Sequence, residues 1–431
     1  MQVNPARRAA LKELLLFFRD GRYANLAQGA ALDRCDLREA DRALFTRLYY
    51  GVIQRKITMD YLLSHWSDRP LNKLDPAVLV ALECGLYQIL YMDRVPDRAA
   101  VDESVKLVQK EGPGSAGFVN AVLRRASAEK ANVEKMLDLP GGKGLSLREG
   151  YPRYLVSLWI EQYGRETAEI ICREQNGAAP LTLRVNTLKT DKEAVIERLS
   201  AAGIPCRISR LCKNGVILEK AASPASLPGW EEGDFFVQDA AAQRAADLLE
   251  AAPGETVLDL CAAPGGKSFS VAMDMEDRGA VIATDLHPAR VRLIEEGARR
   301  LGLTCIRAFA RDAALPDPAF AGKADKVLCD VPCTGYGVIA KKPDIRLKGR
   351  DEGRDLPEIQ GAILRAGAKA LRPGGRLVYA TCTLNKRENE EVTARFLEEN
   401  DSFYALSEPE TILPRAGEND GFFTAVLEKK A

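Results

Sequence analysis

Hydrophobic residues recur at steps of three and four positions along residues 5–135, which is the spacing of one face of an α-helix. The segments NPARRAALKELLLFFRDG (4–21) and DPAVLVALECGLYQILYMD (75–93) show this spacing clearly. Turn signals, DRP at 68–70 and EGPGSAG at 111–117, separate the periodic segments. The pattern predicts an all-α domain over residues 1–137 with five or more helices.

The pattern changes in the middle of the chain. A Gly-rich stretch at 138–152 is a plausible linker, and the helical segment 154–175 follows it. Four short segments then read as strand, helix, strand and strand: LTLRVN (181–186), DKEAVIERLSAAG (191–203), PCRISRL (205–211) and GVILE (215–219). We therefore expect residues 138–240 to hold linker helices and a small α/β, RRM-like subdomain.

From residue 241 to 431, apolar strands alternate with helical segments. Near-continuous apolar strands separated by helices favour a parallel sheet covered on both faces, as in a Rossmann-like α/β domain. Ligands of such sheets bind at the carboxyl ends of the strands. The polar residues that follow each strand are therefore the candidate site.

The composition of the chain limits where the protein can act and which side chains can carry out its chemistry. No apolar run approaches the roughly 18 residues of a membrane span, and the N-terminus lacks a signal-peptide cleavage site, so we expect a cytoplasmic protein without a membrane partner. The 10 cysteines form no CxxC pair, which fits reduced thiols. With only 2 histidines, a His-rich metal site or a Ser-His-Asp triad is disfavoured. The chemistry must use carboxylates, lysines or thiols, and no metal is expected.

A Gly-rich turn, VLDLCAAPGGKS (257–268), ends the first strand of the C-terminal domain. A P-loop needs glycine where Cys261 stands, and the dinucleotide fingerprint G-x-G-x-x-G is also absent. Two interpretations remain open, a nucleoside-cofactor turn of another kind and a tight turn that binds nothing.

Acidic residues end three strands in series. Asp285 ends VIATD, where a carboxylate in a doubly wound fold accepts hydrogen bonds from both ribose hydroxyls. Asp312 is placed to accept from an exocyclic amine, and Asp330 follows the fourth strand. Each acid alone could be a solvated loop residue, but the series indicates a bound nucleoside.

Two cysteines are expected at neighbouring strand ends. Cys333 lies three residues after Asp330 in CDVPCTGYG (329–337), and Cys382 ends the next strand in YATCT (379–383). A single cysteine is usually a small buried hydrophobe, but two beside an acid suit covalent catalysis on a pyrimidine. A thiolate that adds to carbon 6 makes carbon 5 nucleophilic. The acid would hold the base edge and stabilise charge at ring nitrogen 3, and the second thiol could help to release the adduct.

The segments CAAPGGKS, DVPCTG and YATCT, in this order and spacing, resemble the motifs of RNA 5-methylcytosine methyltransferases of the RsmB, Sun or Fmu type. The resemblance implies S-adenosylmethionine as cofactor, Cys382 as nucleophile, Cys333 as the cysteine of product release, and Asp330 for base orientation and charge stabilisation. The cofactor residues that it implies are Cys261, Ala262, Ala263, Pro264, Gly265, Gly266, Lys267, Asp285, Asp312 and Asp330.

The resemblance covers nearly the whole chain. AGFVNAVLRR (116–125) is similar to a NusB-like helical RNA-binding domain, and NDGFFTAVLEK (419–429) is similar to the terminal strands of the catalytic domain. This fusion implies 16S rRNA as partner and a cytosine-C5 methyltransferase activity on a base splayed from its loop. No heptad or interface-like repeat is visible, so we expect a monomer.

The basic stretch at residues 331–376 bears on whether the chain binds a nucleic acid. Residues 331–376 hold 10 Lys/Arg against 5 Asp/Glu, which fits either a solvated helix face or a rim that contacts phosphates. Within AKKPDIR (340–346), the resemblance assigns Lys341, Lys342 and Arg346 to RNA, although family members often show Arg and His there. A transfer RNA cytosine-C5 methyltransferase and a non-catalytic NusB-like RNA-binding protein remain as alternatives.

Overall fold

The computed structural model describes residues 3–21, 24–35, 37–109, 114–179, 181–220 and 223–431. The chain forms two compact units. The first holds residues 1–176 and 341–350, and the second holds residues 177–340 and 351–431. The boundaries expected at 137 and 240 divide the chain more finely and stay predictions. In the described part of the chain, no helix has both the length and the apolarity needed to cross a membrane.

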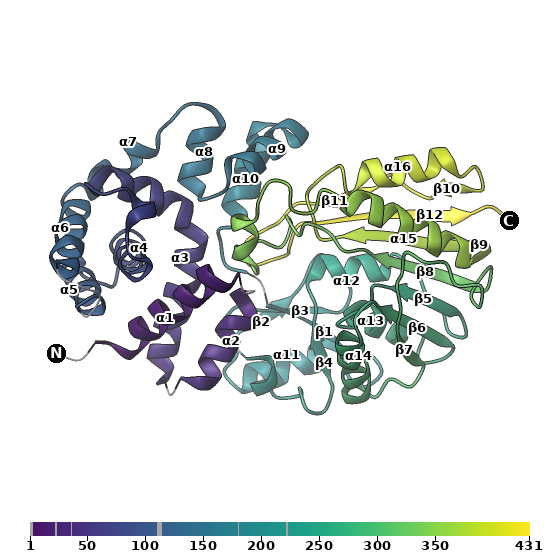
Figure 1. Ribbon diagram of the computed structural model, residues 1–431. Helices are drawn as coiled ribbons and strands as arrows, with labels where there is room; N and C mark the ends of the chain where they lie inside the picture. The colour runs from purple at the N-terminus through teal and green to yellow at the C-terminus, as the bar shows by residue number, and fades with distance from the viewer. Residues whose placement is uncertain (1–2, 22–23, 36, 110–113, 180, 221–222) are drawn as a thin grey trace. The chain divides into compact units, whose positions relative to one another are not determined.

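The first unit is helical, as the periodicity predicts (Figure 1). Asn4 caps the first helix by accepting a 3.2 Å hydrogen bond from the Arg7 N–H, and Gly21 ends it in the left-handed region, with φ 62°. The elements are α1 (Pro5–Asp20), α2 (Ala24–Arg34), α3 (Glu39–Trp66), η1 (Leu71–Lys73), α4 (Pro76–Tyr91), α5 (Asp97–Leu107), α6 (Ser115–Ala128), η2 (Lys130–Asn132), α7 (Val133–Leu137), α8 (Gly141–Glu149), α9 (Arg153–Tyr163), α10 (Arg165–Glu174) and η4 (Pro343–Leu347).

One apolar core holds these helices together. Leu14 of α1, Phe45 and Leu62 of α3 and Leu82 of α4 are fully buried in it. The Gly-rich stretch at 138–152, expected to link the domains, contains helix α8. Its apolar residues Leu145 and Leu147 are buried, and burial of this kind stabilises a helix despite its glycines.

The second unit begins with a small four-stranded sheet in the order β2-β3-β1-β4. All of its strand pairs are antiparallel. The predicted strand, helix, strand and strand are all present, and a further strand follows them. The elements are β1 (Leu181–Val185), α11 (Lys192–Ala201), β2 (Cys206–Ile208), β3 (Gly215–Leu218), η3 (Pro224–Ser226) and β4 (Phe235–Val237).

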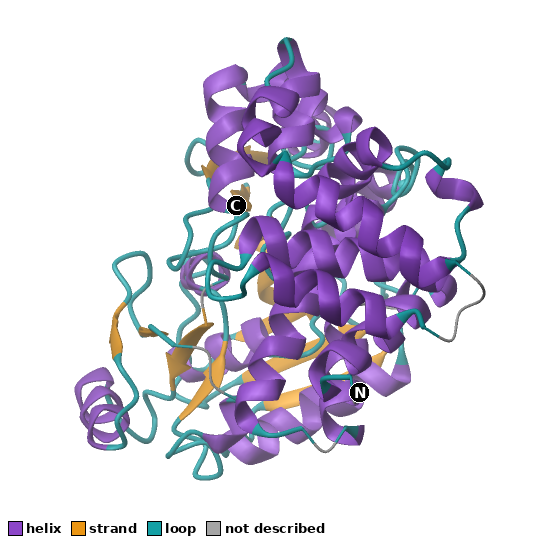
Figure 2. Ribbon diagram, turned by 90° about the vertical axis from the view of Figure 1, so that its left-hand side faces the viewer, coloured by secondary structure: helices purple, strands orange, loops and turns teal. Residues whose placement is uncertain are grey.

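The larger sheet of the second unit runs in the order β10-β12-β9-β8-β5-β6-β7, with β11 paired to β12 (Figures 1 and 2). Five consecutive strands of this sheet, which ends at β7, are parallel: β5 (Thr256–Leu260), β6 (Ala280–Asp285), β7 (Ile306–Ala310), β8 (Ala324–Asp330) and β9 (Leu371–Thr381). The terminal strands β10 (Phe403–Ala405), β11 (Glu410–Ile412) and β12 (Phe422–Lys429) pair antiparallel. The sheet is therefore mixed rather than wholly parallel.

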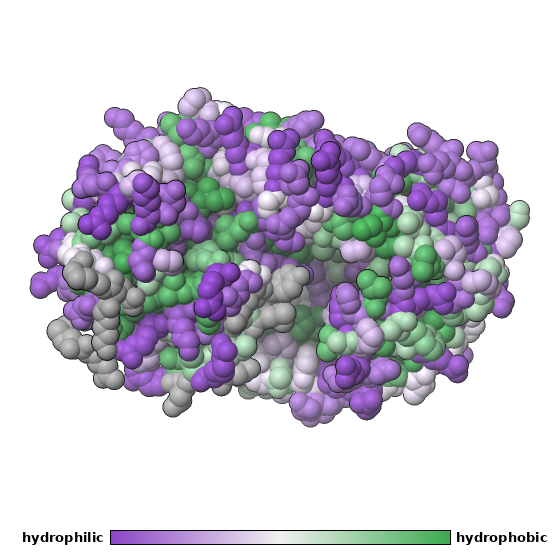
Figure 3. Space-filling model, viewed as in Figure 1, coloured by the Kyte–Doolittle hydropathy of each residue, from purple (hydrophilic) through white to green (hydrophobic). Residues whose placement is uncertain are grey.

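Helices cover both faces of this sheet, and each face has its own apolar core. Phe269 of α13 (Gly266–Asp274) and Ile294 of α14 (Pro288–Leu301) lie in one core, near α12 (Ala240–Asp247). Leu364 of α15 (Leu356–Ala370) and Phe396 of α16 (Glu390–Glu399) lie in the other. On the surface drawn in Figure 3, hydrophilic and hydrophobic residues are interspersed. Because β9, β8 and β5 are neighbours in the sheet, their carboxyl ends lie side by side between the two helical layers.

Candidate active site

The two predicted cysteines meet at the carboxyl ends of β8 and β9. These strands are paired so that Asp330 lies opposite Ala380, and the Val331 N–H extends the pairing with a 3.1 Å hydrogen bond to the Ala380 carbonyl. The loops beyond the strands bring the Cys333 and Cys382 Sγ atoms to 3.4 Å from each other. The predicted juxtaposition of the two thiols is confirmed.

A close backbone approach holds these loops in place. The Gly337 N–H donates a 2.9 Å hydrogen bond to the Cys382 carbonyl, and the Gly421 N–H donates a 2.8 Å hydrogen bond to the Gly337 carbonyl. A Cβ atom at position 337 would stand 2.1 Å from the Gly421 carbonyl oxygen and 2.9 Å from the Cys382 carbonyl oxygen. Only glycine fits between these two backbone segments.

The Cys333 thiol holds its proton more tightly than an ordinary cysteine. A hydrogen bond with Cys382 is the main cause that raises the pKa of the Cys333 thiol well above its usual value, and burial, the Cys382 sulfur and the Glu388 carboxylate add to it. The raised pKa favours the protonated form of Cys333, and either sulfur of the pair can act as the donor of the hydrogen bond between them. A thiol that receives such a hydrogen bond is stabilised as a thiolate, which is the nucleophilic form.

Lys267 brings a positive charge to the same place. It is the second residue of α13 and is 9% exposed, and its Nζ lies 2.7 Å from the Asp330 Oδ2. Burial by itself would lower the pKa of Lys267, but the attraction of Asp330, Asp259 and the Cys382 sulfur raises it above its usual value. The ammonium group is thus paired with the acid and also interacts electrostatically with the Cys382 sulfur. The sequence assigned Lys267 to the cofactor loop, and its ion pair with Asp330 was not foreseen.

The predicted cofactor turn lies against the end of β6. The Ala262 N–H donates a 2.7 Å hydrogen bond to the Thr284 carbonyl, and the Gly265 N–H donates a 2.8 Å hydrogen bond to the Ala262 carbonyl. Cys261 has φ 68° and Gly265 has φ 109°, so the turn is tight. It leads directly into α13, whose first N–H groups carry the positive end of the helix dipole.

Asp285 is buried beside this turn, and its carboxylate is only 2% exposed. Oδ1 accepts a 3.1 Å hydrogen bond from the His287 N–H, and Oδ2 lies 3.1 Å from the Arg290 Nη1. Arg290 also donates a 2.9 Å hydrogen bond to the Ala263 carbonyl, so it links the acid to the turn. Asp312 follows β7, is exposed, and accepts a 2.9 Å hydrogen bond from the Ala314 N–H.

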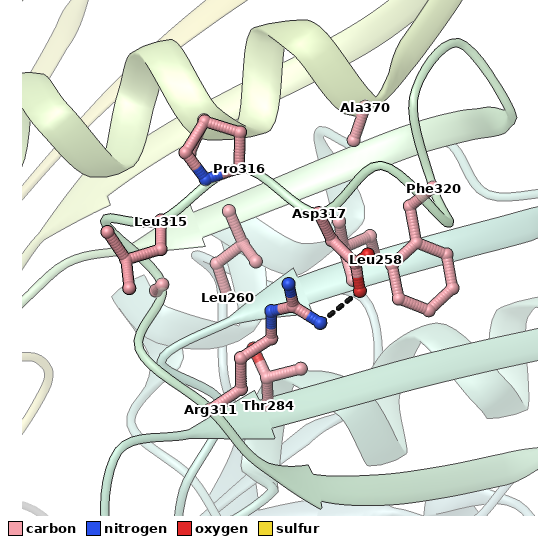
Figure 4. A pocket seen from close by; sticks show the side chains of 11 residues that line it. Leu258, Leu260, Thr284, Arg311, Leu315, Pro316, Asp317, Phe320 and Ala370 are labelled. Atoms are coloured by element: carbon pink, nitrogen blue, oxygen red, sulfur yellow. Dashed lines mark hydrogen bonds and ion pairs between the residues drawn. The ribbon is translucent and has the colours of Figure 1, made fainter.

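Asp259 lies beneath the turn without exposure to solvent. Its Oδ2 accepts a 2.5 Å hydrogen bond from the Ser268 hydroxyl, and its Oδ1 has no hydrogen-bond partner. Burial raises the pKa of Asp259 to about 7. A small pocket on the α15 face of the sheet lies close by, because Leu260 and Thr284 line it and directly precede Cys261 and Asp285 (Figure 4). Its lining is mainly apolar, apart from Thr284 and the ion pair of Arg311 with Asp317.

Arg346 does not suit its predicted contact with RNA. It is 1% exposed and lies within the first unit, where its guanidinium is 3.9 Å above the Tyr151 ring. It donates hydrogen bonds to the Tyr151 hydroxyl at 2.8 Å and to the Gln54 and Glu149 carbonyls at 3.2 Å. The guanidinium is therefore used inside the protein. Lys342 is exposed and Lys341 is partly buried, and their contact with RNA stays a prediction.

The sequence analysis did not single out Glu388, which lies in the segment KRENEE (386–391) after Cys382. Its side chain is fully buried beside the loops of both cysteines. The one signal in the sequence is a polar run directly after the Cys382 loop, and this signal does not say which residue points inward. Among the described residues, no cluster of His, Cys, Asp and Glu side chains could hold a metal ion.

Family models match three parts of the chain. The model described as 16S rRNA methyltransferase RsmB/F matches residues 246–428, the NusB family matches residues 4–128, and an RsmF/B-like ferredoxin-like domain matches residues 151–224. Together with the observed elements, these matches confirm the predicted fold class: a NusB-like helical domain, a small α/β subdomain and a Rossmann-like catalytic domain.

Relatives and solved structures match over similar lengths. The probable ribosomal RNA small subunit methyltransferase B of Bacillus subtilis is 37% identical over 100% of both chains, and the ribosomal RNA small subunit methyltransferase B of Pseudomonas putida is 34% identical over 100% of this chain and 99% of the relative. The crystal structure titled PH0851 covers 100% of both chains at 25% identity with a TM-score of 0.84. A methyltransferase homolog protein from Pyrococcus horikoshii covers 68% of this chain and 99% of its own at 28% identity, with a TM-score of 0.59.

Proposed function

Because the chain belongs to the family of RsmB-type ribosomal RNA small subunit methyltransferases, we propose that it methylates carbon 5 of a cytidine in 16S rRNA through a covalent adduct with Cys382. The observation that carries the proposal is the pair of sulfur atoms 3.4 Å apart, beside the ion pair of Lys267 with Asp330. Ring nitrogens and ribose hydroxyls already carry lone pairs and need no thiol to become nucleophilic. Carbon 5 needs one, because only addition at carbon 6 gives it electron density.

The first step is addition of Cys382 to the base. The thiolate forms a bond from sulfur to carbon 6, and the electrons of the double bond between carbons 5 and 6 move toward carbon 5 and ring nitrogen 3. Asp330 holds the base edge, and the Lys267 ammonium, 2.7 Å from Asp330, balances the negative charge that arises at nitrogen 3. Lys267 therefore supports both the nucleophile and the acid.

The groups around the turn suit a nucleoside sulfonium. The Asp285 carboxylate at the end of β6 can accept from ribose hydroxyls, Asp312 can accept from an exocyclic amine, and the turn 261–266 brings backbone N–H groups close to a ligand. S-adenosylmethionine, when bound, supplies the methyl group that carbon 5 takes up. Since Arg290 lies on Asp285 at 3.1 Å, it is positioned to share the carboxylate with such a ligand.

Release requires loss of the proton that remains on carbon 5. When a base takes this proton, the double bond between carbons 5 and 6 forms again, the bond from sulfur to carbon 6 breaks, and Cys382 leaves as a thiolate. Cys333 is a titratable group whose sulfur lies 3.4 Å from the leaving sulfur, so we assign it to this step. The choice of 16S rRNA over transfer RNA rests on the family, and action as a monomer stays a prediction.

The test is bisulfite sequencing of 16S rRNA from cells that carry or lack the gene. We expect one cytidine to lose its protection without the gene and to regain it with the wild-type chain but not with Cys382→Ala. Cys333→Ala should accumulate a covalent complex between RNA and protein, seen as a retarded band on a denaturing gel. An unchanged 16S pattern would refute the substrate, and full activity of Cys382→Ala would refute the mechanism.

A further inference from the structure

Glu388 is a buried carboxylate close to both cysteines. It precedes α16 by two residues, and its side chain has no solvent exposure. Among the described residues, no basic side chain forms an ion pair with it. A carboxylate that is buried without a basic partner is costly unless hydrogen bonds compensate it. Its partners therefore show what it holds in place.

Four donors surround the Glu388 carboxylate. Oε1 accepts from the Thr334 hydroxyl at 2.6 Å and from the Asn385 amide at 2.8 Å. Oε2 accepts from the Thr334 N–H at 2.9 Å and from the Gln360 amide at 3.0 Å. Three of these donors are N–H groups, which cannot accept a proton from Glu388, so the site is built for the charged form.

These bonds reach the residue that follows each cysteine. Thr334 follows Cys333 and is bound directly, through its N–H and its hydroxyl. Thr383 follows Cys382 and is bound in series, because its hydroxyl lies 2.7 Å from the Thr334 hydroxyl, which itself donates to Glu388. Hydrogen bonds thus connect both cysteine-bearing loops to one carboxylate. The connection is direct on the Cys333 side, and on the Cys382 side it passes through the Thr334 hydroxyl.

We propose that Glu388 is a positioning residue that fixes the two sulfur atoms against each other and assigns their shared proton to Cys333, leaving the negative charge on Cys382. The proposal deepens the proposed function and rests on it for the catalytic meaning of the thiolate. A negative carboxylate stands behind Cys333, and the positive Lys267 stands at Asp330 beside Cys382. Opposite charges on the two sides polarise the pair in one direction.

The titratable groups that face Cys333 agree with this direction. Cys382, Glu388 and Tyr379 interact with it. The Glu388 charge is one of the causes that raise the pKa of Cys333, after the hydrogen bond to Cys382, burial and the charge of the Cys382 sulfur. Burial raises the pKa of Tyr379 well above its usual value, so Tyr379 stays neutral, and its hydroxyl donates a 2.6 Å hydrogen bond to the Glu388 carbonyl. Lys267 responds to the Cys382 sulfur in turn.

The arrangement also gives an order to the steps. While Cys382 is a thiolate, its charge and its hydrogen bond keep the proton on Cys333. Once the Cys382 sulfur is bonded to carbon 6, it carries no negative charge, and two of the causes that raise the pKa of Cys333 are gone. Cys333 can then lose its proton to water and take the proton of carbon 5. Glu388 thus adds to the causes that keep Cys333 protonated during addition, and formation of the adduct permits its deprotonation afterwards.

The test reads the reactivity of each cysteine without RNA or cofactor, so it does not depend on the identity of the substrate. The purified chain is treated briefly with iodoacetamide between pH 6 and pH 9, and modification of Cys333 and Cys382 is quantified by mass spectrometry of their peptides. Iodoacetamide reacts with the thiolate, and one unit of pKa changes the thiolate fraction about tenfold. In the wild-type chain we expect Cys382 to react first, and faster modification of Cys333 would overturn the proposal.

Variants of Glu388 separate its charge from its bulk. Glu388→Gln has the same size without the charge, and we expect the ratio of Cys382 to Cys333 modification to fall, by about tenfold for each unit by which the pKa of Cys333 drops. Glu388→Asp keeps the charge and should keep most of the wild-type ratio. The exposed Glu391→Gln is the matched control and should leave the ratio unchanged. A wild-type ratio in Glu388→Gln, or an equal fall in Glu388→Asp, would overturn the assigned role.

The methylation reaction gives a second measurement. In single-turnover methylation, Glu388→Gln should lower the rate. The decline of the rate at high pH should move to lower pH, since Cys333 loses its proton at a lower pH. The concentration that gives half the maximal rate, which reports RNA binding, should stay the same. An unchanged pH profile would overturn the proposal. Failure of the bisulfite test together with the expected alkylation ratios would refute the substrate and leave the role of Glu388 intact. If Glu388→Gln does not fold, the wild-type and Glu388→Asp ratios decide.

Discussion

Arg184 provides a sharp test of how the second unit is held together. It is a buried residue of β1, and its side chain is 1% exposed. Its Nη1 lies 2.8 Å from the Asp247 Oδ1 at the end of α12, and its Nη2 lies 2.9 Å from the Asp274 Oδ1 at the end of α13. One guanidinium thus joins the small sheet to two helices of the larger domain, and α13 begins at the turn 261–266.

The cost of losing this group follows from its burial. Arg184→Met keeps much of the apolar length but leaves two carboxylates without their partner. Removal of one member of a buried ion pair costs about 3–5 kcal/mol. The Asp247 and Asp274 side chains are 13% and 28% exposed, so water can reach them in part, and we take the lower end, about 3 kcal/mol. For a domain of this size, 1 kcal/mol changes the melting temperature by about 2–4 °C, so the expected loss is roughly 6–12 °C.

The assay is differential scanning calorimetry of the whole chain, with Arg198→Met as control. Arg198 also forms an ion pair, with Asp234, but its side chain is 42% exposed, and such a pair contributes about 0–1 kcal/mol. Burial raises the pKa of Asp274, and Arg184 opposes this rise. In Arg184→Met the opposition is gone, so Asp274 can protonate on acidification, and the deficit should be smaller at pH 5 than at pH 8. A loss no larger than that of Arg198→Met would refute the reasoning.

Two further predictions concern single buried groups. Burial raises the pKa of Asp259 to about 7, so its ionisation opposes folding, and the stability that it contributes at acidic pH is lost between the unfolded value of about 4 and about 7. Asp259→Asn should therefore melt at a higher temperature than the wild-type chain at pH 8 but not at pH 4.5, and equal differences at both pH values would contradict this sign. In the first unit, Arg346→Met should cost about 2–4 kcal/mol because it leaves buried carbonyl groups without donors. The exposed Arg350→Met in the same segment is its calorimetric control, and similar melting of both variants would show that the buried contacts contribute little.

The meeting of Cys333 with Cys382 could be predicted from the sequence because it depends on a local pattern. Apolar strands alternate with helices, parallel strands place their carboxyl ends at one edge, and a thiol that follows each of two neighbouring strands must come to that edge. The antiparallel strand β12 between β9 and β10 could not be derived in this way. Its position depends on pairing between distant segments rather than on any local periodicity.

The errors have the same origin. Arg346 stands in a polar, basic stretch that predicts a solvated surface, yet Gln54, Glu149 and Tyr151, far away in sequence, form the pocket that buries it. Glu388 stands among other acids, and only the tertiary placement of Thr334 and Gln360 selects it for burial. Local patterns fix elements and strand ends, whereas the environment of a single charged side chain depends on distant residues.

The influence of distant residues also explains how two identical cysteine side chains can differ in their chemistry. Cys333 and Cys382 lie 3.4 Å apart, so their distance from a substrate cannot separate their functions by much. Their surroundings can, because Lys267 favours a charged sulfur on one side and Glu388 disfavours it on the other. The asymmetry begins with the residue after each cysteine. Thr334 binds the carboxylate directly and Thr383 only through another hydroxyl, so the negative charge of Glu388 acts first on Cys333. This is the asymmetry that the proposed mechanism requires if Cys382 is to act as the nucleophile.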